Sequence, residues 1–235
     1  MNLLKISLAC ILLATFTGCL KVDQTLTIKA DGSGELDMSY SMQESTIRQM
    51  EQMAKMQASQ GDPESQADGD QFEFNEAALR KQLEPYEEQG VEIIAIDSKT
   101  AEGWKTMHVR LGFKDLDALM KTDSMQDSNL SIKKNDAGNY LLLQKSGEDV
   151  ADDGTGEQDM TPEMLQQMAP MFAGMKIVQR IKVPGKIINS NASEVKGKTA
   201  SWIYDVDKDP SVINKIRKLR MEIEFEGKGL DLKEI

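Results

Sequence analysis

Short stretches in which apolar and polar residues alternate recur along this chain, and they constrain its fold more than any other feature. The first alternation runs through residues 20–28, stops at the turn-forming residues Asp31-Gly32-Ser33-Gly34, and resumes through residues 36–42. A period of two residues is typical of a β-strand with one buried face. Glycine and aspartate at the break tolerate the positive φ of a tight turn. The first part of the chain therefore predicts a β-hairpin.

Further strands and helices are expected from the same kinds of signal. The expected strands are residues 91–96, 104–113, 130–132, 140–143, 177–183, 200–206 and 219–225. The expected helices are residues 45–58, 75–89, 114–121 and 161–170. In the second helix, Asn75 is the N-cap, Pro85 disturbs the last turn and Gly90 ends the helix. The strand at residues 140–143 is apolar on both faces, so we expect it to be central in its sheet.

These elements predict an α+β fold with a twisted antiparallel sheet of seven to nine strands and two to four helices packed on it. Antiparallel pairing throughout is the simplest assembly. Two acidic segments, at about 57–71 and 146–160, are expected to be mobile loops because they are polar and contain glycine. The length of 235 residues suits a single domain of this kind.

The N-terminal segment has the features of an export signal. Lys5 precedes an apolar run over residues 6–14, which is too short to cross about 30 Å of hydrocarbon as a permanent helix. Small residues precede Cys19, as a signal peptidase requires. We therefore expect cleavage between Gly18 and Cys19, which removes residues 1–18 as a signal peptide and leaves residues 19–235 as a single α+β envelope domain.

Cys19 is expected to carry a lipid. The sequence Phe16-Thr17-Gly18-Cys19 resembles the bacterial lipobox, in which diacylglycerol is attached to the cysteine sulfur. Cleavage would also remove Cys10, so Cys19 would be the only thiol in an oxidising compartment. Each buried methylene contributes about 0.8 kcal/mol, so two or three acyl chains anchor a protein firmly. The alternative is an ordinary signal peptide with a structural Cys19.

Two consequences for placement follow from the residue after the lipid site. Leu20, not aspartate, follows Cys19, which in a two-membrane cell favours delivery to the outer membrane. The first predicted strand also begins within a residue or two of Cys19. The body is therefore expected to lie close against the membrane.

Composition excludes several classes of function. The formal net charge of −11 argues against a nucleic-acid partner. The single histidine, His108, lacks the companions that a catalytic triad or a histidine metal site needs, and alternation places it on the polar side of its strand. The acidic loops do not match the ligand spacing of an EF-hand. The sequence therefore predicts a protein without catalytic residues, cofactor or metal.

Methionine is the most unusual feature of the composition, with 15 in the chain. Six of them lie at helical spacing in two segments and form the predicted ligand or partner face: Met50, Met53, Met56, Met164, Met168 and Met171. Flexible thioether side chains fill irregular apolar surfaces and can repack around a bound group. Thioethers also bind Cu(I), although neither segment contains the histidine or cysteine that would strengthen such a site.

The last quarter of the chain is basic, since residues 176–235 hold 13 basic and 9 acidic residues. Four basic residues cluster there: Lys215, Arg217, Lys218 and Arg220. They could face anionic lipid headgroups at about 1 kcal/mol per residue. Alternatively they form an ordinary charged face that balances the acidic loops.

Several short pieces resemble, in order, the LppM-type bacterial lipoprotein family. They are Gly18-Cys19 followed by Leu20-Lys21-Val22, Asp31-Gly32-Ser33-Gly34, Phe113-Lys114-Asp115-Leu116, Asn129-Leu130-Ser131-Ile132, Val183-Pro184-Gly185-Lys186 and Gly197-Lys198-Thr199-Ala200-Ser201-Trp202. The resemblance implies a surface-attached α+β domain without a defined catalytic centre, and binding of a lipid or glycolipid. Acidic, methionine-rich insertions at 43–72 and 146–175 depart from the family pattern.

The sequence thus predicts a membrane-anchored, non-enzymatic envelope lipoprotein that binds a lipid or another amphiphile between its sheet and its methionine-rich helices. One alternative is a structural or assembly factor that docks on another envelope protein through those helices. Another is a copper-binding module. An apolar cavity of a few hundred Å³ between sheet and helices would favour the lipid, whereas a filled core with exposed methionines would favour a protein partner.

Overall fold

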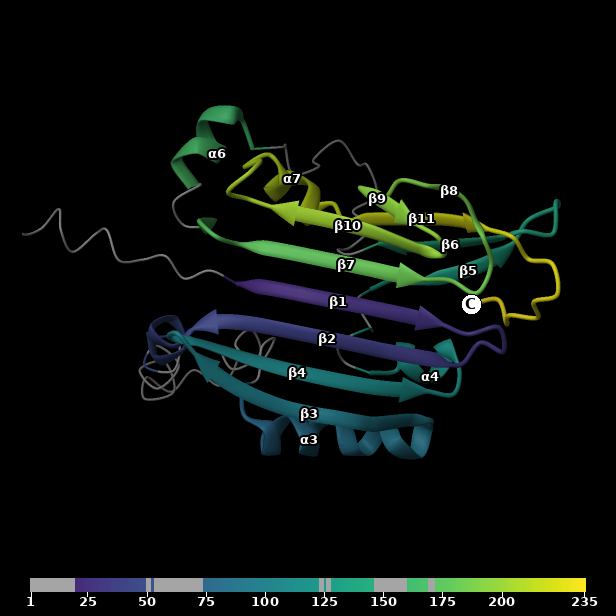
Figure 1. The fold of residues 1–235 in the computed structure, drawn as a ribbon, viewed down its shortest axis with the longest axis horizontal. Coiled ribbons are helices and arrows are strands. Elements are labelled where there is room, and N and C mark those ends of the chain that lie inside the picture. The colour runs from purple at the N-terminus through teal and green to yellow at the C-terminus, as the bar shows by residue number, and fades with distance from the viewer. Residues whose placement is uncertain are drawn as a thin grey trace, which may run out of the picture.

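The computed structural model describes residues 20–49, 52, 74–122, 125, 128–145, 160–168 and 172–235. Within these residues, strands form a seven-stranded sheet, sheet A, and a four-stranded sheet, sheet B (Figure 1). No helix in this part of the chain has both the length and the apolar character needed to span a membrane.

Sheet A has the strand order β3-β4-β2-β1-β7-β10-β9. Its strands are β1 (Lys21–Ile28), β2 (Gly34–Gln43), β3 (Val91–Ala101), β4 (Trp104–Phe113), β7 (Lys176–Lys182), β9 (Glu194–Lys196) and β10 (Thr199–Asp205). Sheet B has the order β5-β6-β11-β8. Its strands are β5 (Ser131–Lys134), β6 (Tyr140–Lys145), β8 (Ile187–Ser190) and β11 (Arg220–Phe225).

Short helices connect the strands and cover parts of the sheets. They are α3 (Glu76–Leu83), the 3-10 helix η3 (Glu84–Gln89), α4 (Leu116–Met120), α6 (Pro162–Met168) and α7 (Val212–Arg217). Residues 44–49 are also helical. The Asn75 side chain accepts hydrogen bonds from the backbone N–H groups of Ala77 and Ala78, as predicted for an N-cap. Gly90, at φ 99°, ends η3 in the left-handed conformation that glycine adopts readily.

One apolar core joins the two sheets and the helices. Sheet B lies behind part of sheet A in Figure 1, so the inner face of sheet A is covered while its other face is open to solvent. Leu26, Met107, Ile132, Tyr140 and Phe225 are among the largest fully buried side chains. The rings of Tyr140 and Phe225 stack with their centroids 5.7 Å apart.

The predicted α+β class is confirmed, as are all nine predicted strands and the central position of β6. The pairing differs in two respects. The strands divide between two sheets, and β1 pairs with β7 in parallel, with Lys21 opposite Lys176. The prediction of an all-antiparallel sheet is therefore wrong at the β1–β7 pair. Alternation indicates which residues of a strand are buried, but it does not indicate which distant strand lies beside it.

The short elements β8, β9 and α7 were not predicted. All three residues of β9 are exposed, so its sequence carries no alternation. The first predicted helix begins at residue 44, and the described residues include its backbone to residue 49 and residue 52. The two predicted mobile loops lie outside the described residues, except for Met160.

Candidate functional site

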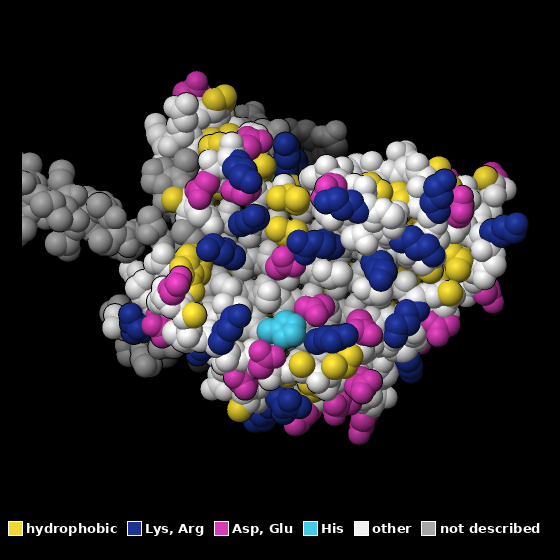
Figure 2. Space-filling model, in the orientation of Figure 1, with side chains coloured by type: hydrophobic (Ala, Val, Ile, Leu, Met, Phe, Trp, Pro, Cys, Tyr) yellow, Lys and Arg dark blue, Asp and Glu magenta, His cyan; other side chains and the backbone are white. Residues whose placement is uncertain are grey.

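The open face of sheet A is polar. We call it the outer face, and it carries Asp23, Asp37, Asp97, His108 and Arg180. Figure 2 looks onto this face and shows basic and acidic side chains intermingled around the single histidine. The opposite faces of the same strands supply buried residues of the core. Polar residues on one face and apolar residues on the other are expected from strand alternation when one face of a sheet is covered and the other is exposed to solvent.

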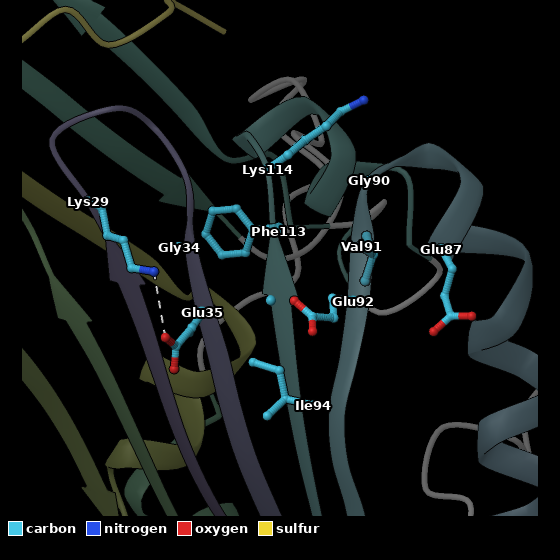
Figure 3. Close-up of a pocket in the computed structure, with 11 residues that line it drawn as sticks. Lys29, Gly34, Glu35, Glu87, Gly90, Val91, Glu92, Ile94, Phe113 and Lys114 are labelled. Atoms are coloured by element: carbon cyan, nitrogen blue, oxygen red, sulfur yellow. Dashed lines mark ion pairs between the residues drawn. The ribbon is translucent and has the colours of Figure 1, made fainter.

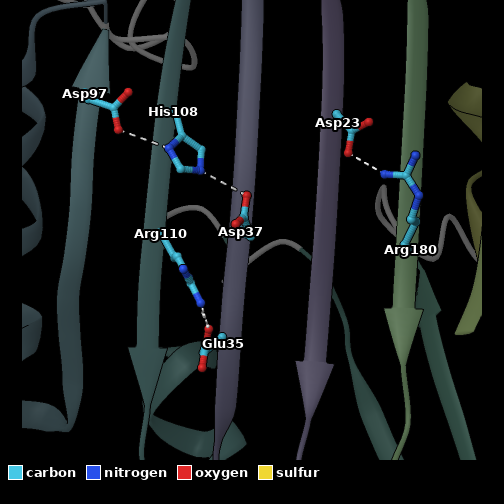
Figure 4. A network of polar contacts seen from close by, with 7 residues as sticks. All are labelled: Asp23, Glu35, Asp37, Asp97, His108, Arg110 and Arg180. Atoms are coloured by element: carbon cyan, nitrogen blue, oxygen red, sulfur yellow. Dashed lines mark hydrogen bonds and ion pairs between the residues drawn. The ribbon is translucent and has the colours of Figure 1, made fainter. Parts of the chain in front are cut away.

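His108 on β4 bridges two carboxylates from the neighbouring strands (Figure 4). Its Nδ1 lies 3.1 Å from Oδ2 of Asp97 on β3, and its Nε2 lies 3.1 Å from Oδ1 of Asp37 on β2. Asp97 stands directly opposite His108 in the β3–β4 register. The hydrogen bond to Asp97 raises the pKa of His108 most, and Asp37 adds to it, while partial burial opposes both.

This geometry limits what His108 can do chemically. The polar position predicted for it is confirmed, but its two carboxylate partners were missed, because they come from strands that the sequence does not align. Both ring nitrogens are engaged, so neither is left to take a proton from a nucleophile. No group of three or more His, Cys, Asp or Glu side chains that could hold a metal ion occurs among the described residues.

Two further ion pairs continue across the outer face (Figure 4). Arg110 donates from Nε and Nη2 to Oε2 of Glu35, at 3.1 and 2.6 Å. Hydrogen bonding to Arg110 is the main reason that the pKa of Glu35 lies below its usual value. Arg180 on β7 pairs with Asp23 on β1. Acidic and basic side chains on the outer face therefore largely neutralise one another's charge, as is usual for a solvated sheet surface.

A hollow of about 390 Å³ opens on the outer face next to Glu35 (Figure 3). Its floor is Gly112 of β4, which stands between Glu35 of β2 and Glu92 of β3. Because Gly112 has no side chain, the space between the two carboxylates stays open. Ile94, at a bulge in β3, forms an apolar wall and is 43% exposed. The mixed lining suits a small polar group and not an acyl chain.

A second, smaller hollow of about 90 Å³ lies between the β1–β2 turn, α4 and residues 231–235. Neither of these two hollows lies between sheet A and sheet B. Neither hollow is therefore the apolar cavity between sheet and helices that would favour lipid binding inside the fold.

The other notable region is the end of sheet A at which β1 begins, which we call the β1 end. It comprises Lys21 of β1, Gln43 of β2, Trp104 of β4, Lys176 of β7 and Asp205 of β10. The Lys21 Nζ lies 4.0 Å from the centroid of the Trp104 ring. Apolar side chains that are only partly buried pack beside these residues: Leu20, Phe172 and Met175. Backbone hydrogen bonds from Lys176 to Leu20 and from Val206 to Met175 tie them to the sheet.

Most of the predicted lipid and methionine sites fall outside the described residues: Gly18, Cys19, Met50, Met53, Met56 and Met171. Met164 lies on α6 and is 48% exposed, while its neighbour Leu165 is buried. Met168 ends α6, and its side chain lies outside the description. The predicted copper alternative thus remains a prediction.

The structure brings the four predicted basic residues to one short region. Lys215 and Arg217 lie on α7, Lys218 follows as its C-cap, and Arg220 begins β11. Lys215 pairs with Asp209 at 3.8 Å, and Arg220 pairs with Glu222 two residues further on. These partners fit the interpretation of an ordinary charged face, although contact with lipid headgroups stays a prediction.

Comparison with known proteins gives structural likeness but no match in sequence. No family model matches the chain, and no curated protein shows a significant sequence match. The NMR structure of the LppM folded domain from Mycobacterium tuberculosis matches with a TM-score of 0.43 and 12% sequence identity, over 89% of this chain and 91% of that chain. This likeness concerns the arrangement of the chain alone.

Proposed function

We propose that this protein is a lipid-anchored, non-enzymatic protein of the bacterial envelope that binds a lipid or another amphiphile at the β1 end. The supporting observation is the start of β1 at Lys21, which leaves only Leu20 between the sheet and the proposed lipid site at Cys19. An anchor attached this closely holds the β1 end of the sheet near the bilayer. Leu20 after the cysteine favours the outer membrane.

The strand register gathers the methionine-bearing segments at the same end. β2 ends at Gln43, near Lys21, because β1 and β2 are antiparallel. β7 begins at Lys176, directly opposite Lys21, because β1 and β7 are parallel. The segment that follows β2 and the segment that precedes β7 both contain clustered methionines. Both segments therefore join the sheet next to the proposed anchor.

The chemistry of the β1 end suits an amphiphile. Leu20, Phe172 and Met175 are packed against the core but only partly buried. Two inner-face residues of the adjoining strands, Val22 and Ile177, are partly buried as well. Apolar side chains in this state gain further burial when an acyl chain contacts them, at about 25 cal/mol per Å². Methionine can adapt its shape to such a chain.

The test uses the full chain produced in a bacterial envelope. After detergent phase separation, the wild-type protein is expected in the detergent phase and the Cys19→Ser variant in the aqueous phase. Native mass spectrometry of the extracted wild-type protein should show the acyl groups and a bound amphiphile. Equal partitioning of both proteins into water would refute the anchor, and acylation without any bound amphiphile would refute the binding role.

A second candidate function is docking on another envelope protein, and the exposure of Met164 on α6 favours it. An exposed methionine beside the buried Leu165 on the same helix fits an adaptable partner surface. A photo-crosslinking residue at position 164 would capture one discrete envelope protein if docking is the role. The same residue at Lys133, exposed on β5, serves as the control and should capture none.

A further inference from the structure

Trp104 and Lys21 have the chemistry of residues that lie at the boundary between water and lipid. Trp104 is partly exposed at the start of β4, and Lys21 is exposed at the start of β1. A tryptophan ring presents an apolar body with one polar N–H, and such rings concentrate at membrane interfaces. Lysine can lay its aliphatic stem on an apolar surface while its ammonium group reaches water or phosphate.

We propose that the β1 end is the surface with which the protein contacts the bilayer, with Trp104 inserted at headgroup level and Lys21 beside it. This inference rests on the proposed lipid anchor at Cys19. It adds the orientation of the protein on the bilayer. The strands of sheet A point away from the membrane, and the part of the outer face that holds the hollow is exposed to water.

The strand register determines which residues reach the membrane first. Lys21 stands opposite Ser41, and Gln43 stands opposite Trp104. Trp104 therefore lies two residues beyond the row of Lys21, in the direction from which the chain enters β1. At about 3.3 Å per residue, this places the Trp104 row about 7 Å beyond Lys21. Trp104 and Lys21 lie on the same face of the sheet, so the ring and the ammonium group can meet.

The reach of the chain agrees with the thickness of the headgroup layer. Lys21 follows Cys19 by two positions, and two extended residues span at most about 7 Å. The polar layer of one leaflet, which is half the difference between the full bilayer and its hydrocarbon core, is about 5–7 Å thick. With the lipid inserted, the Trp104 row therefore falls within the headgroup layer, while Lys21 lies near its outer boundary.

The charges at the β1 end are compatible with a lipid surface. Lys176 and Lys208 both approach Asp205, at 3.8 and 3.5 Å, and the Asp205 side chain is only 17% exposed. Asp207 accepts a hydrogen bond from the backbone N–H of Gly174. Figure 2 shows basic, acidic and hydrophobic side chains side by side along the left edge of the molecule, where β1 starts. A zwitterionic headgroup layer can accommodate this mixture of charges.

The second tryptophan supplies an internal reference. Trp202 is 3% exposed on β10, and its Nε1 donates to Asn191. In the register it stands opposite Gln179, which in turn pairs with Gln24. This row lies three residues from Lys21 in the direction away from the membrane, and thus about 16 Å from the Trp104 row. Only one of the two rings can therefore come close to lipid.

The experiment measures tryptophan fluorescence of the acylated full chain in phosphatidylcholine vesicles, with and without bromine near the headgroup end of one acyl chain. Bromine quenches a ring only at close approach. The wild-type protein should lose fluorescence in brominated vesicles, and the Trp104→Phe variant should lose almost none. In the Trp202→Phe variant, which keeps only Trp104, we expect about a twofold or larger loss, as for a ring at the interface.

A matched control places an exposed tryptophan at the opposite end of the same sheet. Lys182→Trp in the Trp104→Phe background should show no added quenching, because Lys182 ends β7 on the far side. Vesicle flotation separates the two proposals. Protein that floats without quenching of Trp104, or with equal quenching at position 182, contradicts the orientation alone. Protein that does not float contradicts the anchor and, with it, the orientation.

Discussion

The two ends of sheet A are built differently. At the β1 end, Leu20, Phe172 and Met175 are only partly buried. At the opposite end, which we call the closed end, Val183 and Phe113 of sheet A and Phe225 of the adjoining sheet B are almost fully buried. The hydroxyl of Tyr140 there accepts a hydrogen bond from the backbone N–H of Leu232 at 3.0 Å. These side chains are thus packed more completely at the closed end than at the β1 end. We therefore expect the closed end to contribute more to stability.

Truncation of a core ring at the closed end should have the largest effect. Phe225 is 0% exposed and stacks on Tyr140, so Phe225→Ala should lower the free energy of unfolding by about 3–5 kcal/mol. Met175→Ala at the β1 end removes a partly buried side chain and should cost less than about 2 kcal/mol. Urea unfolding followed by circular dichroism measures both. Equal losses would show that the two ends contribute alike.

Alanine substitutions of one glycine at each end of sheet A should change the unfolding free energy by intermediate amounts. A Cβ at Gly34, at the closed end, would lie 2.0 Å from the Thr27 carbonyl oxygen and 2.3 Å from the Phe113 ring. The backbone cannot yield easily, so Gly34→Ala should cost about 3 kcal/mol in unfolding free energy. Gly103, at the β1 end, has open space around it and a φ of +76°. Gly103→Ala should cost only the backbone term of about 1 kcal/mol.

Thermal or urea unfolding of the two alanine variants gives the ranking directly. A Gly103 variant as unstable as the Gly34 variant would mean that the β1 end is packed as tightly as the closed end.

The smallest effect concerns the outer face between the two ends. The pKa of His108 is raised in the folded protein, chiefly by Asp97 and then by Asp37. A raised folded pKa stabilises the protein fully below the unfolded value of about 6.5, and this contribution is lost as the pH rises through the folded pKa. Because the histidine side chain is 34% exposed, we expect at most about 1 kcal/mol.

His108 is the only histidine in the chain, so this pH window is free of other imidazole groups. Unfolding free energies measured on both sides of pH 6.5 should fall toward higher pH in the wild type and stay level in His108→Gln. A slope that persists in the variant would assign the pH dependence to another group.

Local chemistry allowed the strands to be predicted from sequence, but not their arrangement. The β1–β2 hairpin, the Asn75 cap and the Gly90 stop all depend on residues a few positions apart, and all three occur as expected. The parallel pairing of β1 with β7 joins residues far apart in the chain. Alternation is equally compatible with either direction of pairing, so no local signal could have revealed it.

The polar site on the outer face could not be predicted from the sequence either, because it too depends on how distant strands pair. His108 meets Asp37 and Asp97 only because three strands lie in a specific register. The hollow exists because Gly112 falls between two glutamates from other strands. Single-sequence periodicity could place each of these residues on a polar face, but it could not place them next to one another.

The parallel pairing of β1 has a consequence for biogenesis. A chain is synthesised amino end first, so β1 and β2 can pair long before the residues of β7 arrive. Until then one edge of β1 offers its backbone N–H and C=O groups to any other chain. Closing that edge is a contact of long sequence separation and hence a slow step. A newly made molecule therefore has one edge of its first strand unpaired until β7 arrives, and during that interval pairing with another chain competes with folding.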